Sequence, residues 1–209
     1  MTHAIIGNPV NHSLSPKIYN HLFDYFGIDR VYEKSENLNI MSTLEACNIT
    51  YPFKKDAFIL CDKLTKEAKL IGSVNTIINR NGQLKGTNTD GIGFVKSISE
   101  FKEITFILII GAGATSKAAS IALKKAGYIV AVANRSSIPL LTFEDCLVYP
   151  FNNYNKEFKP DLVVNMTPVG LEDNEIPFPQ EIEEIIKDSS VVIDLIYNEL
   201  LRGKPFIIF

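Results

Sequence analysis

The sequence has few cysteines and no cluster of them. Its 209 residues include only three, Cys47, Cys61 and Cys146, which are scattered along the chain without a C-x-x-C spacing. A disulfide framework is typical of short secreted chains with paired cysteines, and a structural zinc site needs clustered Cys and His ligands. The sequence therefore predicts neither a disulfide framework nor a metal site.

Long hydrophobic runs and runs of basic residues are also missing. No apolar stretch approaches the roughly 20 residues that a transmembrane helix requires, and Met1 is not followed by the regions of a signal peptide. The formal net charge is −3 and no segment is rich in Lys or Arg, which argues against a nucleic-acid binder. We therefore expect a cytoplasmic protein that binds neither membranes nor nucleic acid.

Apolar material is sufficient for a folded core, since hydrophobic residues make up 46% of the chain. In the first half, short apolar runs alternate with helical patterns. A helix is predicted from Ser15, as N-cap with Pro16 at the first helical position, to about Phe26. Asn81-Gly82 predicts a hairpin turn, and a further helix is expected from Gly91 to about Phe101. These features predict an α/β domain over residues 1–95.

The second half, residues 96–209, has a different pattern. The segment "TFILIIGAGATSKAASIALKKAGYIVAVANRS" contains an apolar strand, a Gly-rich turn, an Ala-rich helix and a second apolar strand. "DLVVNMTPVG" and "VVIDLIYN" add strands, and "FPQEIEEIIK" reads as the helix between them. Unbroken rather than alternating apolar strands are typical of parallel sheets covered on both faces. We predict a Rossmann-like, doubly wound parallel sheet.

The Gly-rich turn is in the context that a dinucleotide-binding turn requires, because it follows a strand and opens a helix. Gly111 permits the tight turn, Gly113 lets a pyrophosphate approach the backbone, and the small Ser116 allows the helix to pack against the strand. The helix N-terminus offers free N–H groups to a phosphate. The alternative is a turn that serves packing alone. The candidate cofactor residues here are Gly111, Ala112, Gly113, Ala114, Thr115 and Ser116.

The next strand ends in Asn134, Arg135 and Ser136, with no carboxylate for a ribose 2′-hydroxyl. The planar guanidinium of Arg135 suits a phosphate dianion instead. NADP is therefore favoured over NAD, and the alternative is an arginine that simply lies at the surface.

Polar residues cluster at four places in the first half: Ser13 with Ser15, Asn48 with Thr50, Asn75-Thr76, and Asn88-Thr89-Asp90. Each cluster has an ordinary alternative, since serine caps helices and Asn and Thr satisfy backbone groups in turns. Together they predict a pocket rich in hydroxyl and amide groups, suited to a small polyol or hydroxy acid.

The order of motifs resembles the shikimate dehydrogenase family. The resemblance covers about residues 4–198 and rests on "GNPVNHSLSP", "NITYPFK", "GSVNT", "GTNTDGIGF", "IIGAGATSKA", "NRS", "NMTPVG" and "IDLIYN". It implies reversible, NADPH-dependent reduction of 3-dehydroshikimate to shikimate. It also implies an N-terminal α/β substrate-binding and catalytic domain (1–95) and a C-terminal Rossmann-like NADP-binding domain (96–209), with the site in the cleft between them.

The resemblance also implies roles for individual residues. The implied substrate contacts are Ser13 and Ser15 to the carboxylate, Asn48 and Thr50 to the ring, Asn75 to ring hydroxyls, Thr89 beside Asp90, and Tyr197. The implied cofactor contacts, besides the Gly-rich turn, are Asn134 and Arg135 with Ser136 at the 2′-phosphate and Asn165, Met166 and Thr167 near the nicotinamide.

Lys54 and Asp90 are the implied catalytic pair. Hydride addition to a carbonyl carbon builds negative charge on oxygen, which a positioned ammonium stabilises and can protonate. A neighbouring carboxylate holds such an ammonium in place. Which member transfers the proton is left open. The neighbouring Lys55 falls outside the motif and is expected to be replaceable.

Besides a compressed segment between Ser35 and Cys47, two departures from the family's pattern bear on the site. Ile138 and Pro139 stand where the family often has a second basic residue, and after Asn198 the family's last, substrate-contacting segment is lacking. Loss of that segment is expected to expose apolar surface, so a homodimer is a hypothesis. The alternatives are an NAD-using quinate/shikimate dehydrogenase or a paralogue with another hydroxy acid, and a ligand-sensing relative without turnover.

Overall fold

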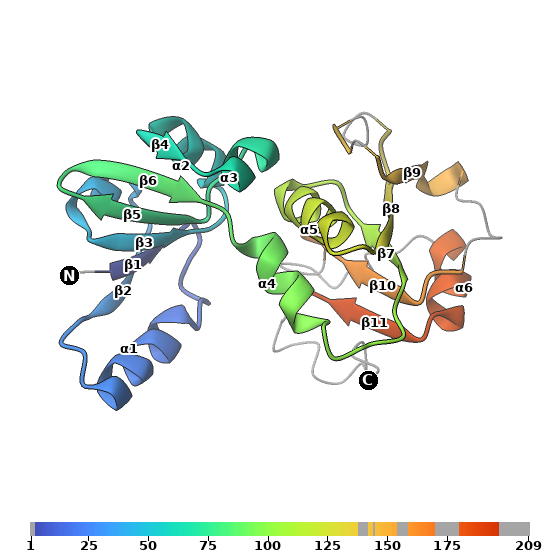
Figure 1. Ribbon diagram of the computed structural model, residues 1–209, viewed down its shortest axis with the longest axis horizontal. Coiled ribbons are helices and arrows are strands. Elements are labelled where there is room, and N and C mark those ends of the chain that lie inside the picture. The colour runs from blue at the N-terminus through green and yellow to red at the C-terminus, as the bar shows by residue number, and fades with distance from the viewer. Residues whose placement is uncertain (1–2, 138–141, 144, 154–158, 170–179, 197–209) are drawn as a thin grey trace. The chain divides into compact units, whose positions relative to one another are not determined.

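The chain forms two compact units, Met1–Thr89 and Asp90–Phe209, so the division falls a few residues before the predicted boundary. The computed structural model describes residues 3–137, 142–143, 145–153, 159–169 and 180–196 (Figure 1). Over these ranges, no helix is long and apolar enough to cross a membrane.

The first unit contains a six-stranded mixed sheet with the order β2-β1-β3-β5-β6-β4. The three strands β2, β1 and β3 are parallel, and β5 is antiparallel to both β3 and β6. Its strands are β1 (His3–Ile6), β2 (Tyr32–Ser35), β3 (Ala46–Ile49), β4 (Lys63–Leu64), β5 (Thr76–Arg80) and β6 (Gln83–Thr87).

The predicted hairpin is confirmed by β5 and β6. Asn81 and Gly82 both have positive φ, 55° and 82°, as a two-residue type I′ turn requires. This turn sets the register that pairs Thr76 with Thr87, so the two ends of the hairpin that carry polar residues lie side by side.

The helices of the first unit are α1 (Ser15–Phe26), α2 (Lys54–Leu60), α3 (Lys66–Ile71) and the 3₁₀ helix η1 (Leu38–Thr43). The prediction of Ser15 as N-cap is wrong. Ser15 is the first helical residue, the N-cap is Leu14, and the hydroxyl of Ser13 accepts a hydrogen bond from the Ser15 N–H at 3.3 Å. The capping role thus falls to the serine two positions earlier.

The second unit contains a five-stranded sheet with the order β11-β10-β7-β8-β9, in which every neighbouring pair is parallel. This is a Rossmann-like order, with the first strand at the centre and the chain winding outward in both directions. Its strands are β7 (Phe106–Ile110), β8 (Ile129–Asn134), β9 (Leu147–Pro150), β10 (Leu162–Asn165) and β11 (Val191–Asp194).

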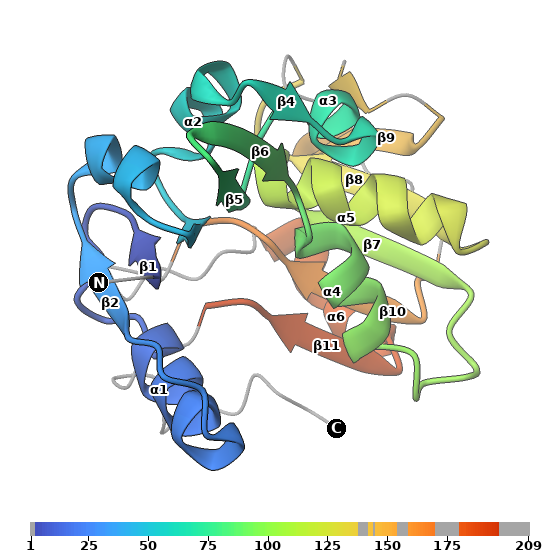
Figure 2. The same ribbon diagram turned by 60° about the vertical axis from the view of Figure 1, so that its left-hand side comes forward.

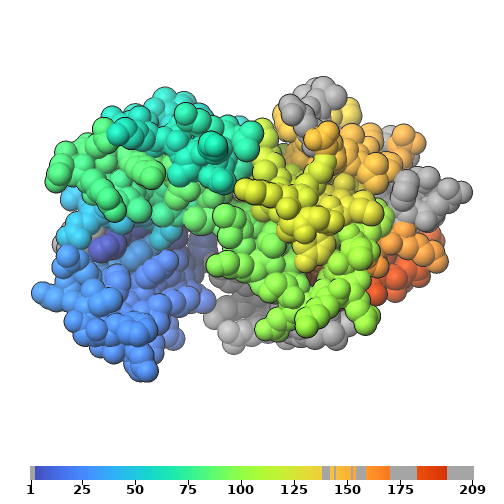
Figure 3. Space-filling model, viewed as in Figure 1, coloured from blue at the N-terminus to red at the C-terminus, as the bar shows by residue number. Residues whose placement is uncertain are grey.

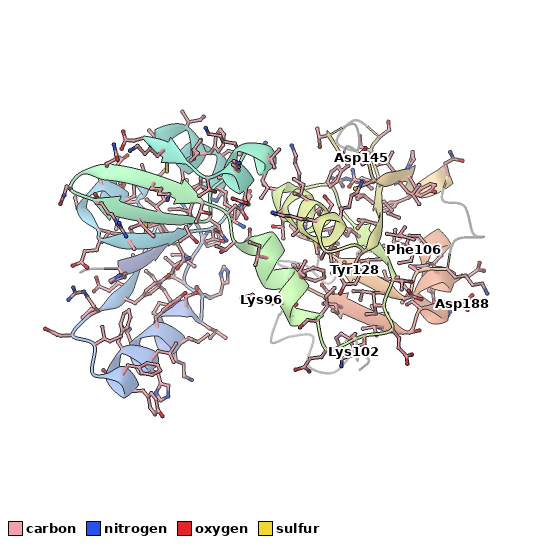
Figure 4. The ribbon with its side chains drawn as sticks, viewed as in Figure 1. Lys96, Lys102, Phe106, Tyr128, Asp145 and Asp188 are labelled. Atoms are coloured by element: carbon pink, nitrogen blue, oxygen red, sulfur yellow. The ribbon has the colours of Figure 1, made fainter. Side chains whose placement is uncertain are left out.

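Helices cover both faces of this sheet, which confirms the doubly wound prediction. One face packs against α4 (Asp90–Ser97) and α5 (Ala114–Lys125), and the other against α6 (Gln180–Asp188). Figure 4 shows the side chains between these layers, with Phe106 at the start of β7 and Asp188 at the end of α6. The central residues Ile107, Leu108 and Ile109 are fully buried, as strands covered on both faces must be.

Helix α4 ends at Ser97, before the predicted end at Phe101. The Ser97 hydroxyl donates to the Phe94 carbonyl at 2.8 Å, and such a side-chain bond competes with a further helical turn. A short 3₁₀ helix, η3 (Phe151–Asn153), follows β9.

Candidate active site

In the first unit, hydrogen bonds join several of the predicted substrate residues. Asn75 is 8% exposed and lies just before β5. Its Oδ1 accepts from the Thr89 N–H at 3.0 Å and its Nδ2 donates to the Thr89 Oγ1 at 3.1 Å. Asn48, on β3, donates from Nδ2 to the Oγ1 of Thr76 at 3.2 Å. The structure therefore brings Asn48, Asn75 and Thr89 into one polar network.

Lys54 is the first residue of α2 and is half-buried, whereas Lys55 is exposed. The Lys54 carbonyl accepts from the Val74 N–H at 2.9 Å, so its backbone is fixed beside the segment that carries Asn75. The structure thus distinguishes the two lysines by burial.

The turn before Lys54 lies tightly against the end of β1. Thr50 donates its N–H to the Ile6 carbonyl at 2.8 Å, and Asn8 donates to the Tyr51 carbonyl at 2.9 Å. A Cβ at Gly7 would come within 2.2 Å of the Thr50 side chain, so the approach requires glycine. This packing explains the glycine that directly follows β1 and opens the motif "GNPVNHSLSP".

Ser13 lies in the turn that leads from β1 into α1, and Ser15 is the first residue of α1. Ser13 is 9% exposed, and its N–H donates to the Val10 carbonyl at 3.0 Å. Because β1 and β3 are parallel, this turn leaves the sheet at the same edge as Thr50. The hydrogen bonds that the structure gives for these serines stay within their own turn, and neither joins the Asn48–Thr89 network.

Asp90 follows Thr89 directly and begins α4, the first element of the second unit. Close packing of α4 on α5 fixes this helix, since a Cβ at Gly91 would lie 2.1 Å from the Ala118 carbonyl oxygen. Figure 3 shows the two helices side by side at the surface of this unit. Asp90 therefore stands at the start of a helix that is held against α5, the helix of the Gly-rich turn.

The Gly-rich turn, residues 111–116, joins β7 to α5, as predicted. Gly111 has φ +104°, and a Cβ there would come within 2.9 Å of the Thr167 side chain, so the fold itself requires this glycine. A Cβ at Gly113 would meet nothing within 4 Å. Because no atom of the described residues explains the second glycine, its open surface fits a pyrophosphate that approaches the backbone.

Ser116 is fully buried, and its hydroxyl has no hydrogen-bond partner among the residues that the structure describes. This placement supports the packing role that the sequence suggests for the third position of the turn. Ala112, Ala114 and Thr115 are half-buried, and α5 begins at Ala114. The N–H groups at the N-terminus of this helix suit an anion.

At the end of β8, the Nδ2 of Asn134 donates to the Ser136 carbonyl at 2.9 Å. This bond closes the turn that carries Arg135, which is exposed, as is Ser136. The Asn134 side chain thus shapes the turn, and the Arg135 guanidinium is left accessible to an anionic group.

Asn165 is fully buried at the end of β10 and uses both ends of its amide. Its Nδ2 donates to Asp194 Oδ1 at 2.9 Å, and its Oδ1 accepts from the N–H and the hydroxyl of Thr167 at 3.0 and 2.7 Å. Asp194 also accepts from the Ile196 N–H at 2.9 Å. The Asn165 side chain therefore holds together the ends of β10 and β11.

Sequence reasoning missed Asp194, although the carboxylate that ends the apolar strand "VVID" is a usable signal.

Met166, predicted to lie near the nicotinamide, follows β10. Its backbone N–H donates to the Ile110 carbonyl at 2.9 Å, directly before the Gly-rich turn. Tyr197 lies outside the described residues.

Cys47 lies in the core of the first unit, where burial raises the pKa of its thiol to about 12. A thiol held in this neutral form is neither a nucleophile nor a ready metal ligand. Within the part of the chain that the structure describes, no group of three His, Cys, Asp or Glu residues could hold a metal ion.

Residues 5–77 match the family model described as the shikimate dehydrogenase substrate binding domain. The NADP(+)-dependent shikimate dehydrogenase of Helicobacter hepaticus is 36% identical over 214 residues, covering 94% of this chain and 77% of that protein. The corresponding protein of Pyrococcus furiosus is 33% identical, covering 95% of this chain and 77% of its own length.

Solved structures give the same result. The shikimate 5-dehydrogenase of Thermus thermophilus in complex with NADP(H) and shikimate superimposes with a TM-score of 0.83 at 31% identity, over 96% of this chain and 81% of that one. The shikimate dehydrogenase of Aquifex aeolicus gives a TM-score of 0.82 at 34% identity, over 95% of this chain and 80% of that one. The chain therefore belongs to the shikimate dehydrogenase family.

Proposed function

We propose that this protein is an NADP-dependent shikimate dehydrogenase, which reduces 3-dehydroshikimate to shikimate reversibly. The observation that carries the proposal is its 36% identity to an NADP(+)-dependent shikimate dehydrogenase over 94% of the chain. This oxidoreductase reaction belongs to chorismate and aromatic amino acid biosynthesis, and its substrate is a small molecule.

The first unit binds the substrate. Asn48, Asn75 and Thr89 present amide and hydroxyl groups from one network, which suits a ring with several hydroxyls. Thr50 lies at the end of β3 beside them, and the Ser13–Ser15 turn leaves the same sheet edge and takes the carboxylate. Tyr197 is the remaining substrate contact in this proposal.

The catalytic pair is Lys54 with Asp90. The Lys54 ammonium stabilises the negative charge that develops on the carbonyl oxygen, and a proton passes from the pair to that oxygen as it becomes the hydroxyl. Asp90 orients the ammonium. The half-buried position of Lys54, with its backbone fixed to Val74, supports this role over one for the exposed Lys55.

The second unit binds NADP, which supplies the hydride when bound. The open backbone at Gly113 and the N-terminus of α5 hold the pyrophosphate, and the exposed Arg135 pairs with the 2′-phosphate. The residues 165–167 line the nicotinamide side. Asn134 and Asn165 contribute by shaping the backbone, since their side chains bond within the protein.

Two further proposals concern the protein's surroundings. We place it in the cytoplasm, where a biosynthetic dehydrogenase meets NADPH.

We also propose a homodimer in which a second copy covers the apolar surface of α1, where Ile18, Tyr25 and Phe26 are 55%, 75% and 66% exposed. Light scattering at micromolar concentration is expected to give the mass of a dimer, and a monomer would count against this arrangement.

A spectrophotometric assay of NADPH formation tests the proposed function. With shikimate and NADP, the purified protein is expected to turn over steadily. Quinate in place of shikimate, and NAD in place of NADP, serve as controls and should give much lower rates. NAD turnover equal to NADP turnover at equal concentration would contradict the cofactor assignment, and folded protein without any shikimate-dependent rate would contradict the function.

A further inference from the structure

Tyr32 supplies a hydroxyl group on which the substrate network depends. The residue begins β2 and is 3% exposed, and β2 lies beside α1 in the first unit (Figure 2). Its hydroxyl donates a hydrogen bond to the Oδ1 of Asn48 at 2.6 Å. No sequence pattern indicates this contact.

Helix α1 fixes Tyr32 at both its backbone and its ring. The Nδ2 of Asn20 donates to the Tyr32 carbonyl, and the Tyr32 N–H donates to the Asn20 Oδ1, both at 2.9 Å. The Tyr19 ring stacks on the Tyr32 ring with centroids 4.5 Å apart and an angle of 9°. The Tyr32 side chain is thus held rigidly with its hydroxyl aimed at Asn48.

The direction of the bond to Asn48 follows from its neighbours. Burial, together with nearby Tyr19, raises the pKa of the Tyr32 hydroxyl well above its usual value, so the phenol keeps a proton that it can donate. On the other side, the Asn75 carbonyl can only accept, and the Nδ2 of Asn48 faces it at 3.5 Å. The Asn48 amide therefore has one satisfied orientation, with Oδ1 toward Tyr32 and Nδ2 toward Asn75.

The donor-to-acceptor order of the hydrogen bonds continues from Asn48 to Thr89. The Thr76 hydroxyl accepts from Asn48 at 3.2 Å and donates to the Oδ1 of Asn75 at 2.9 Å. The Nδ2 of Asn75 then donates to Thr89, the residue before Asp90, at 3.1 Å. One tyrosine hydroxyl thus orders a chain of donors that runs from β2 to the residue preceding Asp90.

We propose that Tyr32 is a positioning residue for substrate binding, whose hydroxyl locks the Asn48 amide in the orientation that receives the substrate. The proposal rests on the proposed function, which places Asn48 at the substrate ring. Because the locked Asn48 amide is already ordered before the substrate arrives, binding does not carry the entropic cost of fixing one of its two orientations. Tyr32 itself need not touch the substrate.

The test is Tyr32→Phe, which removes one oxygen atom and keeps the stacked ring. Shikimate affinity is measured by calorimetry without cofactor, and KM and kcat by NADPH formation. We expect the Kd and KM for shikimate to rise about 5- to 20-fold, as for the loss of one buried hydrogen bond, while kcat and the KM for NADP stay within about twofold. A merely structural role would not produce this split.

Tyr19→Phe is the matched control, because it removes a hydroxyl from the partner in the same stack and should bind shikimate as the wild type does. Thr76→Val breaks the network at its next link with Tyr32 intact, and should reproduce the loss of shikimate affinity. In an Asn48→Ala background, Tyr32→Phe should have no further effect on shikimate binding.

Wild-type shikimate affinity in both Tyr32→Phe and Thr76→Val would overturn the proposal while leaving the proposed function intact. So would an equal loss in Tyr19→Phe, or a loss that persists in the Asn48→Ala background. Absence of shikimate binding and of turnover in the wild type would instead overturn the proposed function, and this inference with it.

Discussion

The candidate residues of the two units are arranged in opposite ways. In the first unit the candidate residues are side chains that hold one another, from Tyr32 through Asn48 and Asn75 to Thr89. In the second unit several important positions lack a side chain: Gly113 leaves the backbone bare, Gly111 lets the turn approach Thr167, and Gly91 lets α4 approach α5.

This difference follows from what each unit is proposed to bind. A small hydroxylated ring is recognised by amide and hydroxyl groups in fixed directions, which only side chains can provide at several points. A pyrophosphate is recognised by backbone N–H groups, which need the side chains out of the way. Substitutions in the first unit should therefore change substrate kinetics, whereas those in the second should change cofactor kinetics or stability.

The largest effect is expected for Lys54→Ala, which removes one member of the proposed catalytic pair from the first unit. Turnover with saturating shikimate and NADP should fall by about 10²–10⁴, the usual contribution of a general acid or base. Lys55→Ala, one residue away on the exposed side of α2, is the control and should keep its rate. A near-normal rate in Lys54→Ala would remove this residue from the mechanism.

Gly91→Ala tests whether the stability of the protein depends on the close packing of α4 against α5. The added Cβ would lie 2.1 Å from the Ala118 carbonyl oxygen, so the free energy of unfolding should fall by about 3 kcal/mol, as measured by denaturant titration. Turnover should fall too, because α4 begins at Asp90.

Gly93→Ala is the matched control in the same helix. A Cβ at Gly93 would meet nothing within 4 Å, and the loss of glycine's backbone freedom should stabilise the protein by about 0.5–1 kcal/mol. Equal stability changes in the two variants would show that the packing of α4 on α5 is not as close as described.

Arg135→Ala addresses the cofactor preference. Loss of a charge-assisted bond to the 2′-phosphate should raise the KM for NADP about tenfold and leave the KM for NAD unchanged. Arg80→Ala, at an exposed arginine of the hairpin in the first unit, should change neither constant. An equal effect of Arg135→Ala on both cofactors would mean that the guanidinium does not recognise the 2′-phosphate.

The smallest effect is expected for Ser116→Ala. The Ser116 hydroxyl is buried without a partner in the described part of the chain, so its removal should raise the free energy of unfolding by about 1 kcal/mol without changing the KM for NADP. Ser120→Ala, on the same helix, removes a hydroxyl that donates to the Lys117 carbonyl at 3.0 Å, and should lower stability instead. A loss of stability in Ser116→Ala would show that its hydroxyl has a partner.

Much of the fold could be predicted because local chemistry agrees with it. Asn81-Gly82 predicted the hairpin turn since both positions need positive φ. Unbroken apolar runs predicted the parallel strands because both faces of that sheet are covered. Strand β9 was missed because it is a short edge strand, in which Leu147 and Val148 are 38% and 39% exposed.

The contacts that order the site were harder to predict. Tyr32 meets Asn48 across 16 residues, and Asn165 meets Asp194 across 29, so no local pattern marks either pair. The N-cap of α1 was assigned one residue too late because serine before proline is a common helix start. Here the hydroxyl of Ser13 accepts from the N–H of Ser15, and the helix begins at Ser15, one residue earlier than predicted.

The central claim is that side chains of the first unit hold the substrate and the backbone and Arg135 of the second hold the cofactor. It is tested most directly by measuring the KM for shikimate and the KM for NADP in both Tyr32→Phe and Arg135→Ala. The account predicts that Tyr32→Phe raises only the KM for shikimate and that Arg135→Ala raises only the KM for NADP. A variant that raised both constants equally, or only the constant assigned to the other unit, would contradict it.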